Sequence, residues 1–497
     1  MINHTYYRAL QTRDRRFDGR FFTAVRTTKI FCRPVCPAPT PKFENCQFFN
    51  SAAAALAAGF RPCLRCRPEL SPDLTTYLTT ASSVNRALRL IGAGALDDGT
   101  VEALAQRLGM GARHLRRLFI QHLGVTPVAV AQTRRILFAK QLIDETSLPI
   151  TDIAMAAGFG SVRRFNTAIQ TTYQKAPREL RKLQTPAPPA GQSLIQIKLP
   201  FDPPYAWDAL VRFLQPRVTA GIETITPSAY RRSIALAGQQ GVVEVRPLPD
   251  APYLLAQIQF PEIGALSQIV ERLRQLFDLG ANVGLIAAQL GTDPTLAPLV
   301  EALPGLRVPG CWDGFELAVR AILGQQVTVA AATRLAGRLV QTYGEPLQQE
   351  AADLTSVFPT PERLAEADLT QIGLTAQRSK AINALAVRVA ADPDFLTHAD
   401  LEGAHLTALP GIGGWTASYI AMRALREPDA FPASDLGLLR AMAKLGQPVT
   451  KAELLHRSQA WRPWRAYAAL YLWQSESLWQ SQNLAVQQAV QQVDRVG

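Results

Sequence analysis

Apolar and polar residues change their spacing several times along the chain, and each change indicates a different kind of element. From about residue 82 to 183 the apolar positions recur at helical spacing. Segments such as LIQIKLP and VVEVRPL then alternate apolar and polar residues, as strands do, and strand-like sequence mixed with one or two helices continues to about Leu299. From Leu303 the pattern is helical almost to the end. This order predicts a multidomain chain that is mainly α with α+β parts.

Composition marks the boundaries between these segments. With 497 residues the chain is long enough for several domains. Five of its six cysteines lie near the N-terminus, and the segment QTPAPPAGQS is a proline-rich linker that cannot continue a helix. We predict four domains and one linker, with the bounds 1–75, 83–183, 184–193, 194–302 and 303–480.

Charge is concentrated in the first third of the chain. Residues 1–183 contain 27 Lys and Arg residues against 12 Asp and Glu residues, and the whole chain has a formal net charge of +12. Such an excess is typical of a protein that binds a polyanion, although a solvated basic surface gives the same count. The chain has no run of about 18 apolar residues and begins without an apolar leader. We therefore expect a cytoplasmic protein with no membrane partner.

Two similar units recur within the basic helical segment. TVEALAQRLGMGARHLRRLF begins at Thr100 and PITDIAMAAGFGSVRRF begins at Pro149. Each unit reads as a short helix, a glycine-containing turn and a second helix with arginines, which is the helix-turn-helix pattern. Together with a joining helix over 128–144, the units resemble the AraC-type DNA-binding domain over residues 83–183. That resemblance implies DNA contacts, to phosphates more often than to bases, by Arg113, Arg116, Arg117, Arg163 and Arg164.

The cysteines of the N-terminal segment are spaced as metal ligands are. Three residues separate Cys32 from Cys36, 26 residues follow, and two residues separate Cys63 from Cys66. Two close pairs of thiolates can enclose Zn²⁺ in a tetrahedron, and a disulfide module is disfavoured in a reducing cytosol. We predict one Zn²⁺ held by these four residues. The fifth cysteine of the segment, Cys46, is interpreted as a packing residue.

The segment also resembles a particular zinc domain. AVRTTKIFCRPVC and AAAALAAGFRPCLRCRPE are similar to the N-terminal domain of the Ada family of alkylation-response regulators, in which an AraC-type domain follows in the same order. The resemblance implies that Cys32 accepts a methyl group from DNA methylphosphotriesters. Where the family has arginines, this chain has Pro37-Ala38-Pro39, which leaves Arg26, Arg33 and Arg61 as nearby candidates for phosphate contacts. A purely structural zinc site is the alternative.

The helical C-terminal part contains a glycine-rich hairpin. LTALPGIGGWTASYI predicts two helical stretches joined by a Pro-Gly-Ile-Gly turn, and FPASD ends at Asp435 just before another helical run. Glycines let backbone N–H groups approach a phosphate, so Pro410, Gly411 and Gly413 are candidate DNA-binding residues. Hairpin, helix and a single aspartate follow in the order found in helix-hairpin-helix DNA glycosylases.

Longer segments resemble one group of these glycosylases. PPYAW, GIETI, LRVPGCWDGFELAVRAILGQQV and WRPWRAYAALYLW are similar to the AlkA family of 3-methyladenine DNA glycosylases from about Leu194 to Gln480. The resemblance implies the family's fold, an N-terminal α+β domain followed by a helix-hairpin-helix domain. It makes Asp435 the catalytic carboxylate and places Trp415 and Trp473 in the base pocket, while Tyr419 belongs either to that pocket or to the core.

Two further positions are carried over from the same family. Gln326 stands where the family inserts a leucine into the duplex, so the side chain expected to fill the gap of an extruded base is polar here. The carbonyl groups of Thr407, Leu409 and Ile412 match those that hold a monovalent cation. Trp415 takes the place of the lysine of lyase-type members, which implies a monofunctional enzyme that forms no Schiff base.

The two resemblances together predict a regulator fused to a repair enzyme. Alkylated purines carry a positive charge, which aromatic rings in the pocket would select, and a carboxylate would stabilise the oxocarbenium-like sugar. We expect double-stranded and alkylated DNA and RNA polymerase at promoters as partners, a monomeric chain, and no repair of O6-methylguanine. Two alternatives are a repair enzyme whose first 183 residues only anchor it to DNA, and a transcription factor with an inactive glycosylase domain.

Overall fold

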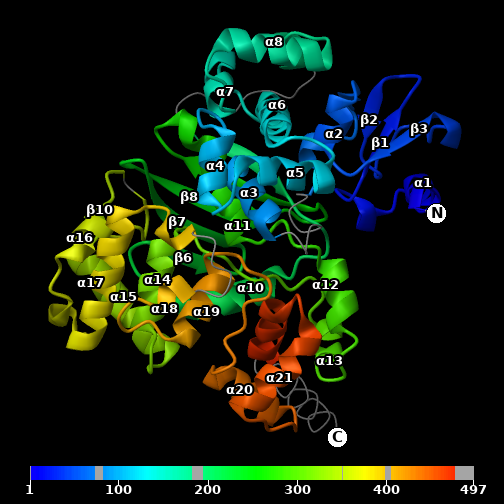
Figure 1. Ribbon diagram of the computed structural model, residues 1–497. Coiled ribbons are helices and arrows are strands. Elements are labelled where there is room, and N and C mark those ends of the chain that lie inside the picture. The colour runs from blue at the N-terminus through cyan, green and yellow to red at the C-terminus, as the bar shows by residue number, and fades with distance from the viewer. Residues whose placement is uncertain (1, 73–81, 182–193, 350, 398–403, 476–497) are drawn as a thin grey trace, which may run out of the picture.

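The computed structural model describes residues 2–72, 82–181, 194–349, 351–397 and 404–475. The predicted proline-rich linker at 184–193 lies outside these ranges. Figure 1 shows a sheet near the centre, with the N-terminal segment (blue) to one side, a group of helices (cyan) above the sheet and the C-terminal helices (yellow to red) below it. This is the predicted multidomain arrangement of mainly α and α+β parts.

The N-terminal segment is built on a small four-stranded sheet with the strand order β3-β1-β2-β4. β1 is antiparallel to both β2 and β3, whereas β4 is parallel to β2. Phe22, Ala24 and Phe31 pack beneath the sheet against the short helix α2. The elements are α1 Ile2–Thr12, β1 Phe22–Val25, β2 Ile30–Cys32, β3 Cys46–Phe49, α2 Ala52–Ala57 and β4 Arg61–Pro62.

The basic segment forms the two predicted helix-turn-helix units. Gly109 and Gly158 adopt positive φ angles of 68° and 80° between the paired helices, a conformation that glycine reaches without strain. The joining helix predicted over 128–144 is α6, one residue longer at each end. The helices are α3 Ser82–Gly92, α4 Val101–Arg107, α5 Ala112–Leu123, α6 Pro127–Glu145, α7 Ile150–Ala156, α8 Val162–Tyr173 and α9 Pro177–Arg181.

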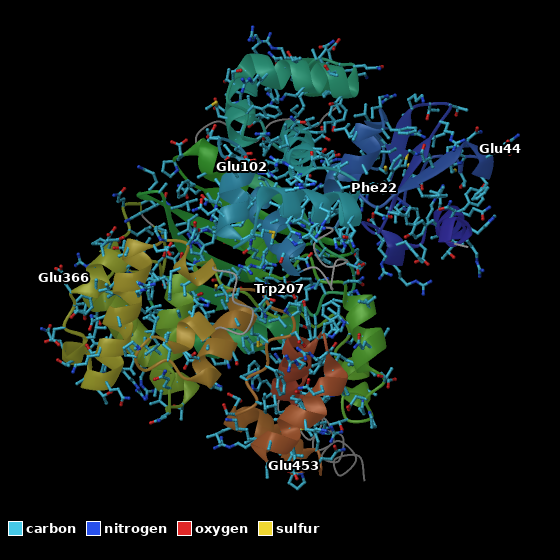
Figure 2. The ribbon with its side chains drawn as sticks, viewed as in Figure 1. Phe22, Glu44, Glu102, Trp207, Glu366 and Glu453 are labelled. Atoms are coloured by element: carbon cyan, nitrogen blue, oxygen red, sulfur yellow. The ribbon has the colours of Figure 1, made fainter. Side chains whose placement is uncertain are left out.

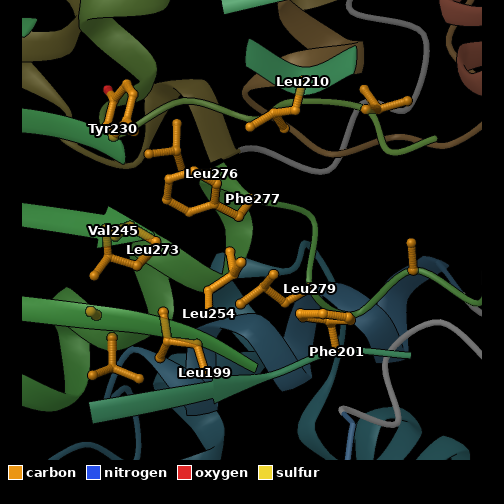
Figure 3. Close-up of a cluster of buried hydrophobic side chains, with 14 of the residues drawn as sticks. Leu199, Phe201, Leu210, Tyr230, Val245, Leu254, Leu273, Leu276, Phe277 and Leu279 are labelled. Carbon is orange, nitrogen blue, oxygen red and sulfur yellow. The ribbon is translucent and has the colours of Figure 1, made fainter. Parts of the chain in front are cut away.

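A five-stranded antiparallel sheet with the order β5-β9-β8-β7-β6 follows. Figure 3 shows its buried side chains, among them Leu199, Val245 and Leu254, pointing towards Leu273 and Leu276 of α11. The elements are β5 Leu194–Pro200, α10 Trp207–Leu214, β6 Glu223–Thr226, β7 Ala229–Leu236, β8 Gln239–Pro247, β9 Tyr253–Gln259, α11 Leu266–Leu276, α12 Val283–Leu290 and α13 Ala297–Ala302.

The remaining helices belong to two hydrophobic clusters. One cluster joins α14, α15, α17 and α19, and the other joins α20 and a last helical segment over residues 465–475 to the five-stranded sheet. The chain therefore returns to the sheet domain at its C-terminal end. The helices are α14 Gly314–Leu323, α15 Val329–Tyr343, α16 Pro361–Ala365, α17 Ala376–Ala391, α18 Ala404–Thr407, α19 Gly414–Arg423, α20 Leu436–Lys444 and α21 Lys451–Arg457.

The helix-turn-helix part packs against the rest of the chain. Buried residues of α6, α7 and α8 belong to the same hydrophobic cluster as the five-stranded sheet, and α3 contacts α11. Polar contacts cross the same interface: Arg89 donates to the carbonyl of Leu425 at 3.0 Å, and Arg107 pairs with Asp394 at 2.6 Å. Among the described residues, no helix has the length and hydrophobicity needed to cross a membrane.

Buried ion pairs tie the five-stranded sheet to α14. Arg232 of β7 donates to Glu316 of α14 at 2.7 Å, and Arg320 of α14 donates to Glu223 of β6 at 3.0 Å. Burial opposes the negative charge of Glu223, but the guanidinium groups of Arg320 and Arg232 outweigh that effect and lower its pKa to about 2. The stabilising contribution of Glu223 is therefore present at neutral pH and is lost only as the pH falls from above 4 towards 2.

Neutralising Glu316 should destabilise the protein because it leaves the buried guanidinium of Arg232 without its closest carboxylate. We expect Glu316→Gln to lower the free energy of unfolding by about 3–5 kcal/mol. Urea unfolding followed by tryptophan fluorescence measures the change. Glu362→Gln, which replaces an exposed glutamate of α16, is the matched control, and equal unfolding midpoints for the two variants would contradict the expected result.

Candidate functional site

The four predicted zinc ligands lie together in the N-terminal domain. The Sγ atoms of Cys32, Cys36, Cys63 and Cys66 all lie within 4.8 Å of one another. Parallel pairing of β2 with β4 produces this arrangement, because the backbone N–H of Cys63 donates to the carbonyl of Phe31, the residue before Cys32. Sulfurs about 2.3 Å from a common Zn²⁺ would be roughly 3.8 Å apart, so the cluster fits a tetrahedral zinc ion.

Hydrogen bonds among the thiols make their ionisation interdependent. The hydrogen bond between Cys32 and Cys36 is the main cause that lowers the pKa of Cys36, to about 7. The same hydrogen bond is the main cause that raises the pKa of Cys32. A divalent cation favours the thiolate form of every ligand. Backbone N–H groups of Arg33 and Arg65 also donate to the sulfurs of Cys66 and Cys63, at 3.3 and 3.4 Å. Together with a bound Zn²⁺, these N–H groups would help to stabilise the sulfurs as thiolates.

Exposure distinguishes the members and neighbours of the cluster. Cys32 is partly exposed, whereas its three partners are buried. Of the arginines considered for phosphate contacts, Arg26 is exposed and Arg61 is partly buried, but Arg33 is buried in a salt bridge with Asp18. The expectation that Arg33 offers its charge to a phosphate is therefore wrong, because its guanidinium also donates to the carbonyl of Cys66 at 3.1 Å.

Cys46, which we interpreted as a packing residue, is buried in β3. Its thiol donates to the carbonyl of Lys42 at 3.4 Å. The residue lies outside the group of four cysteines that could hold a metal.

The candidate DNA-binding arginines lie on the second helix of each helix-turn-helix unit. In α5 the buried residues Leu115, Phe119 and Leu123 form the inner face, and in α8 Phe165, Ile169 and Tyr173 do the same. The opposite faces carry the exposed arginines. Glu102 of α4, labelled in Figure 2, pairs with one of them at 2.7 Å. The exposed residues are Arg113, Arg116, Arg117, Arg163 and Arg164.

Three residues predicted from distant parts of the C-terminal half meet at one carboxylate. Trp415 of α19 donates its indole N–H to Oδ2 of Asp435 at 2.7 Å, and Trp473 donates to Oδ1 at 2.9 Å. Asp435 also caps α20 by accepting from the backbone N–H of Leu438 at 3.1 Å. Both carboxylate oxygens are thus held by donors, which fixes the orientation of the group.

Tyr419 belongs to the same aromatic group. Its ring stacks on Trp415 with centroids 5.4 Å apart and lies 6.3 Å from the ring of Trp473. The hydroxyl accepts from Arg423 at 2.7 Å. Burial disfavours the phenolate, but the positive charges of Arg423 and Arg217 outweigh burial and lower the pKa of Tyr419. Tyr419 thus contacts both Trp415 and Trp473 and also packs against the hydrophobic cluster of α14 and α17, so both interpretations, core and pocket, stay open.

Two residues of this site were not identified from the sequence. Phe213 of α10 stacks on Trp473 with centroids 6.2 Å apart, but its position in an apolar helix looks like that of any core residue. Gly437 lies two residues after Asp435, and a Cβ added there would be 2.8 Å from Oδ1 of Asp435 and 3.3 Å from the indole of Trp473. The close approach of Trp473 to Asp435 therefore requires glycine at this position.

The predicted hairpin and the loop with Gln326 lie next to each other. The side chain of Gln325 donates to the carbonyl of Gly411 at 2.8 Å and to the hydroxyl of Thr416 at 3.0 Å. Gln326 itself is exposed and has a positive φ of 56°. Pro410, Gly411 and Gly413 are exposed as well. The hairpin, the loop and, through Trp415, the carboxylate of Asp435 are therefore parts of one surface region.

Comparisons with known proteins match most of the chain. Four family models match it: the metal binding domain of Ada at residues 5–69, a helix-turn-helix domain at 104–183, the AlkA N-terminal domain at 196–313, and the HhH-GPD superfamily of base excision DNA repair proteins at 319–466. The models follow one another in the order predicted from the sequence.

Curated relatives cover either the whole chain or its halves. The chain is 40% identical over 474 residues to a probable bifunctional transcriptional activator/DNA repair enzyme AlkA of Mycobacterium tuberculosis, covering 94% of this chain and 95% of the relative. It is 35% identical over 288 residues to DNA-3-methyladenine glycosylase 2 of Escherichia coli. This match covers 57% of this chain and 98% of the relative. The solved structure of a 3-methyladenine DNA glycosylase from Archaeoglobus fulgidus is 22% identical and matches with a TM-score of 0.51. The match covers 56% of this chain and 98% of that protein, and the matched parts have the same fold.

The contact between Gly437 and Trp473 can be tested by spectroscopy. In Gly437→Ala the new methyl group should displace the indole of Trp473 from Asp435, because the space beside the carboxylate is already filled. Fluorotryptophan labelling and ¹⁹F NMR should show a shift of one of the seven tryptophan signals, assigned by its loss in Trp473→Phe. Gly111→Ala is the control, since a Cβ there meets nothing within 4 Å. An unchanged Trp473 signal in Gly437→Ala would contradict the expected crowding.

Proposed function

Because the chain belongs to the family of bifunctional transcriptional activators and DNA repair enzymes, we propose that it excises alkylated bases from DNA and regulates the response to that damage. Excision takes place at Asp435, on purines of the 3-methyladenine and 7-methylguanine type. The observation that carries this proposal is the carboxylate of Asp435, held by the indole N–H groups of Trp415 and Trp473 inside an aromatic group.

The residues around Asp435 suit the hydrolysis of an N-glycosidic bond. As the bond between sugar and base lengthens, positive charge develops on the sugar, and the carboxylate of Asp435 stabilises it or orients water. An alkylated purine already carries a positive charge, so it leaves without an elaborate general acid. The rings of Trp415 and Trp473 attract such a cationic base through their π-electrons. With tryptophan instead of lysine at position 415, no Schiff base forms with the sugar.

The N-terminal domain supports a second, separate chemistry. Cys32, Cys36, Cys63 and Cys66 would hold Zn²⁺, which would keep their thiols ionised at neutral pH. The Sγ of Cys32 attacks the methyl carbon of a DNA methylphosphotriester: an S–C bond forms, the C–O bond breaks, and the phosphodiester leaves as an anion. Partial exposure of Cys32 beside three buried partners supports this choice of acceptor. Conversion of the thiolate to a neutral thioether removes one negative charge, which should strengthen binding to DNA.

The other expected partners follow from this proposal. The exposed arginines of α5 and α8 bind DNA at a promoter, where the chain contacts RNA polymerase, and it acts as a monomer. A monovalent cation binds the hairpin carbonyls of Thr407, Leu409 and Ile412. The carbonyl of Leu409 already accepts from the backbone N–H of Ile412 at 3.2 Å, as a turn that presents carbonyl groups does.

The two alternative functions are supported less well. An inactive glycosylase domain would have no reason to keep two tryptophans and a glycine arranged around one carboxylate. A domain that only anchors the protein to DNA would have no need for a zinc ligand that is more accessible than its three buried partners. These arguments favour a protein in which both halves are active.

Asp435→Asn tests the glycosylase. The amide keeps the shape of the side chain but not its charge, so release of 3-methyladenine should fall by at least about 100-fold while DNA binding is retained. Asp368→Asn is the matched control, because Asp368 also caps a helix. A near wild-type rate for Asp435→Asn would exclude the assigned role, and an adduct of the wild-type protein trapped with borohydride would exclude the monofunctional mechanism.

Cys32→Ser tests the methyl acceptor. We expect no transfer from DNA carrying labelled methylphosphotriesters, because a serine hydroxyl is not ionised at neutral pH, while glycosylase activity stays normal. Mass spectrometry of the wild-type protein should locate the methyl group on Cys32, and zinc analysis should give one ion per chain. Cys46→Ser is the control and should transfer normally. Methylation of Cys46 or Cys311 instead of Cys32 would contradict the assignment.

A further inference from the structure

An unusually exposed leucine follows the proposed catalytic residue. Leu436, the first residue of α20, is 65% exposed, the largest value among the exposed large apolar side chains of the described residues. Isolated apolar residues on a surface need no special explanation. This one is the chain neighbour of Asp435, whose carboxylate lies in the aromatic group. DNA that reaches the carboxylate of Asp435 would therefore also come close to Leu436.

The same face of α20 carries positive charge. Leu438, Ala441 and Met442 are buried and form the inner face of the helix, whereas Leu436 and Arg440 are exposed. Residues four positions apart lie one above the other on a helix, about 6 Å apart along its axis. The guanidinium of Arg440 has no ion-pair or hydrogen-bond partner among the described residues. An apolar side chain and an unpaired cation thus form a short stripe that begins beside Asp435.

A second exposed segment near the site is the loop that contains Gln326, and it presents a polar side chain. Gln326, where the family implied an inserted side chain, is polar and exposed, and its loop is tied to the hairpin through Gln325. A polar side chain gains little free energy from packing against bases exposed by an extruded nucleotide. Leu436, the chain neighbour of Asp435, offers the apolar surface that Gln326 lacks.

We propose that the exposed face of α20 is a DNA-contacting surface: Leu436 packs against the opened duplex beside the extruded nucleotide, and Arg440 binds a backbone phosphate about one helical turn further along. The occupant is double-stranded DNA with one nucleotide out of the stack. Charge complementarity between Arg440 and phosphate and continuity with the site at Asp435 identify it. The proposal rests on the glycosylase function and assigns Leu436 a positioning role in it.

Binding to damaged and undamaged DNA tests the role of Leu436. The probes are a duplex with a tetrahydrofuran abasic site and the same duplex without it, because the helix-turn-helix units affect both affinities and cancel in their ratio. Leu436→Ser should reduce the preference for the abasic duplex about tenfold, as burial of a leucine side chain contributes roughly that factor. Leu455→Ser, which replaces a leucine of α21 that is 42% exposed, should leave the preference unchanged.

Salt dependence tests the role of Arg440. In single-turnover excision, Arg440→Gln should raise the half-saturating enzyme concentration about threefold at low salt with an unchanged maximal rate, and the difference should vanish at high salt. The control is Arg363→Gln on α16, an exposed arginine far from α20 in Figure 1.

The proposal is overturned if Leu436→Ser and Arg440→Gln behave like their controls. Failure of the glycosylase function is distinguishable, since the wild-type protein would then release no base while duplex affinities remained measurable.

Discussion

The paired hydrogen bonds from Trp415 and Trp473 to Asp435 are the constraint on which the C-terminal half depends. The two indoles have different neighbours in the core: Trp415 stacks on Tyr419, which packs with α14 and α17, whereas Trp473 packs with the five-stranded sheet. Both donors reach one carboxylate only if the clusters keep a fixed relation to each other. The buried pairs of Arg232 and Arg320 with Glu316 and Glu223 provide that relation, because separating them would leave charges without partners in a medium of low polarity.

The metal centre is built by a similar convergence on a smaller scale. Two cysteine pairs distant in sequence become neighbours because β4 adds to β2 in parallel, and each second cysteine follows within a short turn. Here the converging groups repel one another as thiolates, and only a cation can make all four charges favourable together. At Asp435, by contrast, a single carboxyl group accepts from two neutral indole donors. The two sites therefore respond differently to charge: one needs an added cation, and the other already contains its stabilising partners.

Sequence reasoning identified chemistry that is encoded by residue type and spacing. The four cysteines, the repeated helix-turn-helix units and the order of hairpin, tryptophan and aspartate could all be recognised, because few other residues can perform these roles. Phe213 could not be recognised, since an apolar residue on an apolar helix looks the same whether it faces a core or a site. Gly437 and Leu436 were equally hidden, because their significance depends on what lies beside them in space. The burial of Arg33 against Asp18 was missed because charge alone does not reveal a partner.

The partners of individual arginines account for part of the basic excess in the first 183 residues. Part of that charge is used inside the protein: Arg33 pairs with Asp18, Arg107 with Asp394, and Arg89 lies against the carbonyl of Leu425. Burial lowers the pKa of Arg89 to about 10, a sign of the free energy needed to keep that charge away from water. Arg89 and Arg107 hold the helix-turn-helix part on the C-terminal half of the chain. The positive charge exposed on the surface is therefore smaller than the net charge suggests, and the exposed arginines of α5 and α8 are part of what remains.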